Sequence, residues 1–266
     1  MHVYIINLER SLERRAHMMS ELEKVHLEYS FVTAIDDRQL DLSDSNLVHP
    51  SYQARNDWRP GRIGNGLSHL RVCEAIIASG AEHALILEDD VKVGPELADL
   101  LDALTVYMTG AEVALLHFDS HDTCELSRHG AAKLPACRTL AYPIDLGVPV
   151  GAAAYVITRE ACERVARIGL PIRAHSDDWL HWYNEFALDR VRCVFPHAVT
   201  KDSRFESTIE YVSPSSLKAQ SMKVLRRLPI PMLSTAISYR RRRIWRKWTK
   251  VALVDKPFVT VPSRLQ

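Results

Sequence analysis

Short apolar runs alternate with longer amphipathic segments through most of the chain. The apolar runs are rich in Val, Ile and aromatic residues, a composition typical of buried strands. They cover residues 3–8, 29–35, 84–87, 113–118, 153–158 and 191–195. Segments long enough for helices lie at residues 12–25, 67–79, 96–107, 160–168 and 178–188. Alternating strands and helices predict an α/β fold with a largely parallel sheet.

The composition supports a folded chain of ordinary globular size. With 266 residues, 47% of them hydrophobic, the chain can bury a substantial core, which excludes disorder as its main state. The five cysteines are an odd number without a CxxC pair, so neither a disulfide framework nor a structural zinc site is indicated. The amino terminus lacks the apolar core of a secretion signal, and no apolar run reaches the roughly 18 residues of a membrane span. These features favour the cytoplasm.

The charge is unevenly distributed along the chain. Residues 211–254 contain eleven Lys and Arg and no acidic residue, and residues 255–266 add a net charge of +1. Since the whole chain carries +1, residues 1–210 carry −11. We therefore predict one domain at 1–210 and a basic, helical extension at 211–266. Arginines interleave with tryptophans and aliphatic residues in 218–250, which favours peripheral attachment to an anionic inner-membrane surface. A solvated helical face is the alternative, whereas nucleic-acid binding lacks a recognition fold.

Three adjacent carboxylates follow the predicted strand at 84–87, in the segment LILEDDVKV. In an open α/β sheet, the residues just beyond the carboxyl end of a strand line the ligand crevice. Glu88, Asp89 and Asp90, here called the acidic motif, occupy that place, and their mutual repulsion favours a compensating divalent cation. The alternative is a solvated acidic turn.

The amino-terminal segment INLERSLERR has the same order of strand, polar residues and helix. Asn7 would emerge at the strand end, and Arg10, Arg14 and Arg15 recur at near-helical spacing, where they could face an anionic group. The alternative is a solvated amphipathic helix whose glutamates pair with these arginines.

A glycine-rich turn followed by a helix start is predicted in IGNGLSHLRVCEAII. The glycines permit close approach of the backbone, and Ser68 and His69 would lie in the first helical turn, near amide groups that favour anions. Glycines alone are a weak signal, and a single histidine here is more often structural than catalytic.

Together these segments resemble the glycosyltransferases of family 25, which include bacterial lipooligosaccharide galactosyltransferases and collagen galactosyltransferases. The resemblance rests on YIINLERSLERR, IGNGLSHLRVCEAII, HALILEDDVKV, GAAAYVITREAC, and SDDW followed by VFPHAVTKDS, in that order over about residues 3–210. It implies a GT-A-like nucleotide-sugar fold with a Rossmann-like sheet, and a UDP-sugar donor. It also implies a divalent manganese or magnesium ion and transfer with inversion at the anomeric carbon.

The resemblance also implies roles for particular residues. Gly151 and Tyr155 would shape the donor and acceptor sides of the crevice. The residues expected around the UDP-sugar are Asn7, Leu8, Arg10, Arg14, Arg15, Ser68, His69, Glu88, Asp89, Gly151 and Lys201. Arg62 and Asn65 depart from the family pattern, which usually has an acidic residue and a cysteine there. Lys201 replaces the usual glutamine.

Inverting transfer needs a base for the acceptor hydroxyl and compensation for charge that develops on the leaving diphosphate. We expect Asp178 to be the base, with Asp177 in reserve, although both acids could instead be helix caps. Asp90, Glu88 and His197 are the expected metal ligands, and a packing role for His197 is the alternative.

Two further candidates, Asp119 and His121, follow the predicted strand at 113–118. The sequence therefore predicts an enzyme that transfers a sugar, with galactose favoured, from a UDP-sugar to a glycan or glycolipid. The expected setting is lipopolysaccharide or lipooligosaccharide biosynthesis. The alternatives are a sugar-nucleotide-binding protein without turnover and a metal-dependent phosphohydrolase.

Overall fold

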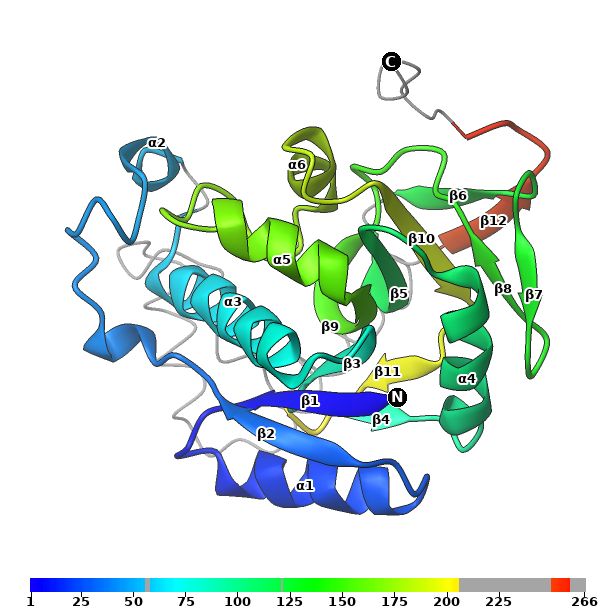
Figure 1. Ribbon diagram of the computed structural model, residues 1–266, viewed down its shortest axis with the longest axis horizontal. Helices are drawn as coiled ribbons and strands as arrows, with labels where there is room; N and C mark the ends of the chain where they lie inside the picture. The colour runs from blue at the N-terminus through cyan, green and yellow to red at the C-terminus, as the bar shows by residue number, and fades with distance from the viewer. Residues whose placement is uncertain (56–57, 121, 206–249, 259–266) are drawn as a thin grey trace, which may run out of the picture.

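The computed structural model describes residues 1–55, 58–120, 122–205 and 250–258. At its centre is an eight-stranded mixed sheet with helices on both faces (Figure 1). The strands, in order across the sheet, are β2 (Tyr29–Thr33), β1 (His2–Asn7), β3 (His83–Glu88), β9 (Val150–Thr158), β5 (Glu112–Asp119), β10 (Arg190–Phe195), β8 (Arg138–Ala141) and β7 (Ala132–Leu134). Strands β1, β2, β3, β5 and β10 run in one direction, because β3 and β5 both pair antiparallel with β9. The predicted α/β fold with a largely parallel sheet is confirmed.

Two apolar cores lie on the two faces of this sheet. On one face pack α1 (Leu12–Glu23) and α4 (Leu97–Tyr107). On the other face pack α3 (Pro60–Ser79), α5 (Arg159–Ile168) and α6 (Trp179–Asn184). Successive residues of β1 belong alternately to the two cores, as the pleat of a strand requires. The five helices predicted from the sequence are all present, with shifted ends.

The strand directions bring several chain segments to one edge of the sheet, here called the carboxyl edge. Strands β1, β3 and β5 end there, at Asn7, Glu88 and Asp119. The antiparallel strand β9 begins at the same edge, so that Val150 pairs with Asp119. Ligands bind at this edge in open α/β sheets.

A short two-stranded sheet adds a late segment of the chain to the carboxyl edge. β4 (Val91–Val93), which follows the acidic motif, pairs antiparallel with β11 (Val199–Lys201). This register sets Lys201 opposite Val91, and the backbone N of Asp202 donates to the carbonyl oxygen of Asp90 at 2.7 Å. Local sequence pattern did not predict either strand.

Helix α3 begins at Pro60, well before the predicted start. The fixed φ of proline suits the first helical position. The expectation that Ser68 and His69 lie in the first helical turn is therefore wrong, since both lie within the helix. A Cβ on Gly64 would lie 2.7 Å from the carbonyl oxygen of Ile35, so this glycine lets α3 pack directly on the loop after β2. Ser68 Oγ accepts a hydrogen bond from Ile35 N at 2.8 Å and supports the same contact.

Remaining short elements lie around the central sheet. They are η1 (Asp37–Gln39) and α2 (Pro50–Gln53), both in the connection between β2 and α3. β6 (Thr123–Ser127) pairs parallel with β12 (Lys250–Val254). The prediction of a helical extension is therefore wrong for Lys250–Val254, which pair with β6 as a strand.

Most of the predicted basic extension, including the membrane-binding segment 218–250 apart from its last residue, lies outside the described residues. None of the described helices is both long and apolar enough to cross a membrane. The division of the chain at residue 210 stays a prediction.

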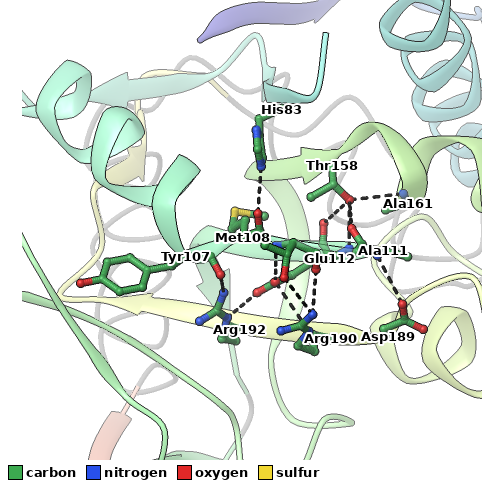
Figure 2. Close-up of polar contacts among 12 residues, drawn as sticks. His83, Tyr107, Met108, Ala111, Glu112, Thr158, Ala161, Asp189, Arg190 and Arg192 are labelled. Carbon is green, nitrogen blue, oxygen red and sulfur yellow. Dashed lines mark hydrogen bonds and ion pairs between the residues drawn. The ribbon is translucent and has the colours of Figure 1, made fainter. Parts of the chain in front are cut away.

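A buried ion-pair network lies at the amino-terminal ends of β5 and β10, at the edge of the sheet opposite the carboxyl edge (Figure 2). The fully buried Glu112 carboxylate, at the start of β5, accepts a hydrogen bond from Arg192 Nε. Arg192 also donates to the carbonyl oxygen of Tyr107 at 2.7 Å, and Thr109 N donates to Glu112 at 3.3 Å. Buried charges persist in proteins when they are paired and hydrogen-bonded. This network therefore joins α4, β5 and β10 at a distance from the carboxyl edge.

Candidate functional site

The acidic motif lies in the link between β3 and β4, and its three carboxylates have different partners. Asp89 accepts hydrogen bonds from Asn7 Nδ2 and Arg14 Nη1, both at 2.7 Å, and is 8% exposed. Each Asp89 oxygen is thus engaged by the amino-terminal segment, from the end of β1 and from α1. Leu8 follows Asn7 at the end of β1. Asp89 therefore connects the acidic motif to Asn7 and Arg14, two of the residues predicted to bind the nucleotide.

Glu88 faces helix α3. Asn65 Nδ2 donates to Glu88 Oε1 at 3.0 Å, and His69 Nε2 lies 3.7 Å from the same oxygen. His69 is held in turn by Tyr155, whose Oη lies 2.8 Å from His69 Nδ1. Burial alone would raise the pKa of Glu88, but His69, Lys201 and Asn65 outweigh it and lower the pKa to about 2. Glu88 is therefore an anion at neutral pH.

Asp90 keeps one buried oxygen, Oδ1, that makes no hydrogen bond within the described part of the chain. Its other oxygen lies 3.4 Å from Arg14 Nη1. Burial and the negative charges of Glu88 and Asp89 raise the pKa of Asp90 to about 6, against the positive charges of Arg14 and Lys201. This oxygen could accept a hydrogen bond from a ligand or bind a cation that comes with the ligand.

Lys201 lies beside the acidic motif, at the end of β11. Its Nζ donates to Asp119 Oδ2 at 2.9 Å, and its side chain is 37% exposed. Burial would lower the pKa of this ammonium, but the charges of Asp119, Glu88 and Asp90 outweigh burial and raise the pKa above its ordinary value. Lys201 therefore stays positively charged among carboxylates from the ends of β3 and β5.

The SDDW segment (Ser176–Trp179) lies at the same edge, held by hydrogen bonds to β9 and α3. The backbone N of Gly151 donates to Asp177 Oδ2 at 2.9 Å. Ser176 Oγ donates to Asn65 Oδ1, while the amide nitrogen of Asn65 reaches Glu88. Asn65 thus links the acidic motif to the SDDW segment.

Asp178 is the N-cap of α6, because its Oδ1 accepts a hydrogen bond from His181 N at 3.1 Å. Asp178 therefore does cap a helix, which was the alternative to its role as the base. Capping uses one carboxylate oxygen, and a base needs only the other. The side chain is partly exposed, which gives an acceptor access to it.

His197 lies in an aromatic cluster after β10. Its ring centroid is 4.6 Å from that of Phe118 and 5.0 Å from that of His117. Burial and the nearby His117 lower the pKa of His197 to about 4, against the charge of Asp119. The charged groups that act on His197 therefore differ from those around Asp90.

The side chains present do not fit a divalent metal centre built by the protein. Asp89 has both oxygens engaged. Lys201, which pairs with Val91 directly after Asp90 and whose ammonium binds Asp119, already places a positive charge that acts on Glu88 and Asp90. Among the residues that the structure describes, no three His, Cys, Asp or Glu side chains form a group that could hold a metal ion. The ligand set of Asp90, Glu88 and His197 stays a prediction from the family resemblance.

Some predicted nucleotide-binding residues lie away from this cluster. The Arg15 guanidinium stacks over the Phe31 ring, 3.9 Å from its centroid, on the β2 side of α1. Arg10 forms an ion pair with Asp36. The further candidate His121 lies outside the described residues.

The sequence pattern did not indicate the part played by Arg62 and Asn65, the two residues that depart from the family pattern. Arg62 Nη1 hydrogen-bonds His175 Nε2, and Tyr52 Oη hydrogen-bonds the other ring nitrogen. Asn65 and His69 are four residues apart on α3, and so both reach Glu88 from one helical face. That spacing was a usable signal in the sequence. Both departures thus support the SDDW segment or the residue before it.

Comparison with known sequences identifies the family. Residues 1–180 match glycosyltransferase family 25 (LPS biosynthesis protein), so the chain belongs to this family. The matched region contains the amino-terminal segment, α3, the acidic motif and the SDDW segment, whereas Lys201 lies beyond it.

Individual relatives each match part of the chain. "Glycosyltransferase 25 family member" of Aedes aegypti is 38% identical over 114 residues, which are 38% of this chain and 18% of that protein. "Procollagen galactosyltransferase 2" of Homo sapiens is 33% identical over 97 residues, 34% of this chain and 16% of that protein. "Inactive glycosyltransferase 25 family member 3" of Mus musculus is 33% identical over 99 residues, again 34% and 16%. The matched stretch spans less than a fifth of the length of these relatives.

Solved structures show only a distant likeness. A putative glucose-1-phosphate thymidylyltransferase from Bacillus anthracis has a TM-score of 0.37 at 9% identity and covers 85% of this chain and 77% of its own. A glycosyltransferase involved in the glycosylation of the major capsid of PBCV-1 has a TM-score of 0.29 at 9% identity and covers 63% of each chain.

Proposed function

We propose that the protein is a glycosyltransferase that moves a sugar from a UDP-sugar to a glycan or glycolipid acceptor, with inversion. One observation carries this proposal: two halves of a site meet at the carboxyl edge. Asn7 and Arg14 hydrogen-bond to the acidic motif, and Asn65 connects Glu88 of that motif to Ser176 in the SDDW segment. A donor and an acceptor could therefore bind side by side.

Polar groups on the nucleotide side suit an anionic donor. Asn7 Oδ1 is buried and makes no hydrogen bond among the described residues, so it can accept one from a ribose hydroxyl. Arg14 and Lys201 can share the negative charge that develops on the departing diphosphate. This distribution of charge favours sugar transfer from a nucleoside diphosphate.

Transfer forms one bond and breaks another. The acceptor hydroxyl oxygen attacks the anomeric carbon opposite UDP, and the bond from that carbon to the diphosphate oxygen breaks. UDP leaves with the electron pair, and the hydroxyl proton passes to the carboxylate of Asp178. Asp177, held by Gly151 N, positions the segment that carries this base.

The donor sugar and the setting are proposed from the relatives and the family. Galactose is favoured because human relatives include "Procollagen galactosyltransferase 2". The family description, LPS biosynthesis protein, supports lipopolysaccharide or lipooligosaccharide as the product. In this proposal the positive charge near the acidic motif comes from Lys201 and not from manganese or magnesium.

Replacement of Asp178 by Asn tests the base. Asn caps helices about as well as Asp, so the variant is expected to fold normally. Loss of a general base should slow transfer about 100-fold or more, while the affinity for UDP stays unchanged. UDP release with a lipooligosaccharide acceptor measures turnover, and NMR of the product reports the anomeric configuration.

Asp177→Asn is the matched control, because its amide oxygen can still accept from Gly151 N. Transfer near the wild-type rate in Asp178→Asn, or a loss confined to Asp177→Asn, would remove Asp178 as the base. UDP binding without any transfer by the wild type would instead favour a binding protein, as the word "Inactive" in the name of the mouse relative suggests for that protein.

We also propose that segment 218–250 attaches the enzyme to an anionic membrane surface, because its many Lys and Arg residues are interleaved with tryptophans and aliphatic residues. Flotation of the full chain with anionic and with neutral liposomes tests this. Equal and negligible binding to both would exclude it.

A further inference from the structure

Lys201 holds a position that strand pairing makes well defined. It is the last residue of β11, and its partner Val91 directly follows Asp90. Its Nζ is 2.9 Å from Asp119 Oδ2, so the ammonium lies at the end of β5, while its backbone pairs with the strand that follows the acidic motif. Solvent reaches about a third of the side chain, which is thus partly open at the carboxyl edge.

Charges at the carboxyl edge divide into two groups. Asp89 is compensated by Arg14 and by the amide of Asn7. The positive charge of Lys201 acts on the remaining acids, which are Glu88, Asp90 and Asp119. Lys201 therefore compensates the negative charge of these acids, a role for which the sequence predicted a divalent cation.

A divalent ion at the same acids would meet strong repulsion from this ammonium. Two positive charges a few ångströms apart in a partly buried site repel each other by several times the thermal energy. A metal ion bound to Asp90 and Glu88 would therefore compete with this ammonium for the same negative charges. A lysine is suited to contact phosphate oxygens itself, as a compact positive charge.

We propose that Lys201 is the resident cation of the acidic motif, and that its ammonium replaces a divalent metal in binding the donor diphosphate. This inference rests on the proposed function, because it assigns a binding role for the UDP-sugar. It predicts that the protein binds UDP, and transfers sugar, in the absence of divalent metal.

Thermal shift and calorimetry of the wild-type chain with UDP test this directly. UDP affinity is expected to be the same in EDTA and in manganese. In Lys201→Gln, which carries the residue usual for the family, the affinity in EDTA should fall about tenfold or more, as for the loss of one charge-assisted contact. Manganese should restore the affinity of this variant, because the acids then lack their internal cation.

Lys92→Gln is the matched control, since Lys92 lies on the neighbouring strand β4 and contacts Asp202, 3.5 Å away. Its UDP affinity should equal that of the wild type in both buffers. Electron paramagnetic resonance with manganese alone gives a readout independent of turnover. The wild type should leave the signal of free manganese unchanged, and Lys201→Gln should reduce it.

Three results of these UDP-binding experiments would distinguish a failure of the role of Lys201 from a failure of the proposed function. Wild-type binding of UDP that EDTA abolishes and manganese restores would overturn the role of Lys201 and leave the transferase intact. UDP affinity of Lys201→Gln equal to that of the wild type in EDTA would also overturn it. Failure of the wild type to bind UDP in either buffer would overturn both proposals.

Discussion

At the scale of single residues, three acids adjacent in sequence have become chemically different. Glu88 has a pKa of about 2, whereas Asp90 has one of about 6. Their different partners explain the contrast, because Glu88 receives Asn65 and faces His69, while Asp90 is buried beside other acids. Glu88 is thus a constant negative charge at neutral pH, whereas Asp90 can change its protonation when a ligand binds.

Asn65→Ala tests the link between Glu88 and the SDDW segment. Loss of a hydrogen bond to a charged group should lower kcat/KM about tenfold. The free energy of unfolding should fall by about 1–2 kcal/mol, because the lost hydrogen bonds to Glu88 and Ser176 outweigh the gain of about 0.5 kcal/mol in helix propensity. UDP release and urea unfolding measure the two effects. Glu74→Ala, an exposed site on the same helix, should change neither, and wild-type transfer by Asn65→Ala would show that the link is unnecessary.

At the scale of elements, helix α3 shows how packing overrides local preference. Glycine costs about 1 kcal/mol relative to alanine inside a helix, yet α3 contains Gly64 and Gly66. Gly64 is required by the backbone of Ile35, which would lie 2.7 Å from an added Cβ. At Gly66 the nearest atom is Ile172 Cδ1, at 3.3 Å, the end of a side chain that can move.

Replacement of each glycine by alanine should therefore have opposite effects. Gly64→Ala should lower the free energy of unfolding by about 1–2 kcal/mol, because overpacking against a backbone outweighs the gain in helix propensity. Gly66→Ala should leave it unchanged or raise it by up to about 1 kcal/mol. Urea unfolding of both variants measures this, and equal effects would contradict the packing of α3 described above.

At the scale of the whole molecule, Asp202 connects α1, β4 and the segment after β11 next to the acidic motif. Its side chain is fully buried and accepts from Arg204, while Lys92 of β4 and His17 of α1 lie 3.5 and 3.8 Å away. Burial alone would raise the pKa of Asp202, but the hydrogen bonds from Arg204 and the charge of Lys92 outweigh it and lower the pKa to about 2. This carboxylate stabilises the fold in its charged form.

The pH dependence of stability should report on Asp202. Because its folded pKa is below its ordinary value of 3.8, its contribution is complete above about pH 4 and is lost as the pH falls through about 2. Asp202→Asn should lose about 2 kcal/mol at pH 7, from a shift of nearly two units at about 1.4 kcal/mol each. The difference from the wild type should shrink toward pH 3.

Urea unfolding at a series of pH values measures this difference, with Asp102→Asn, an exposed site on α4, as the control without effect. A stability difference that stays constant from pH 7 to pH 3 would show that the charge of Asp202 is not the cause.

The sequence by itself determined the main strands, the helices and the position of the acidic motif at a strand end. These features are local, since hydrophobic periodicity and caps such as Asp178 act within a few residues. Only the tertiary structure decided the partners of each acid. Lys201 reaches the motif because β11 pairs with β4, and Asn65 reaches Ser176 because α3 packs beside the SDDW segment.

Pairings of this kind depend on closing long loops and on the shape of the packed core, and neither leaves a periodic signal in the chain. Arg15 shows the same limit, because its helical spacing is that of a site residue, whereas packing directs it onto Phe31. The sequence alone could therefore place charges at the carboxyl edge, but the fold determined which charges compensate one another.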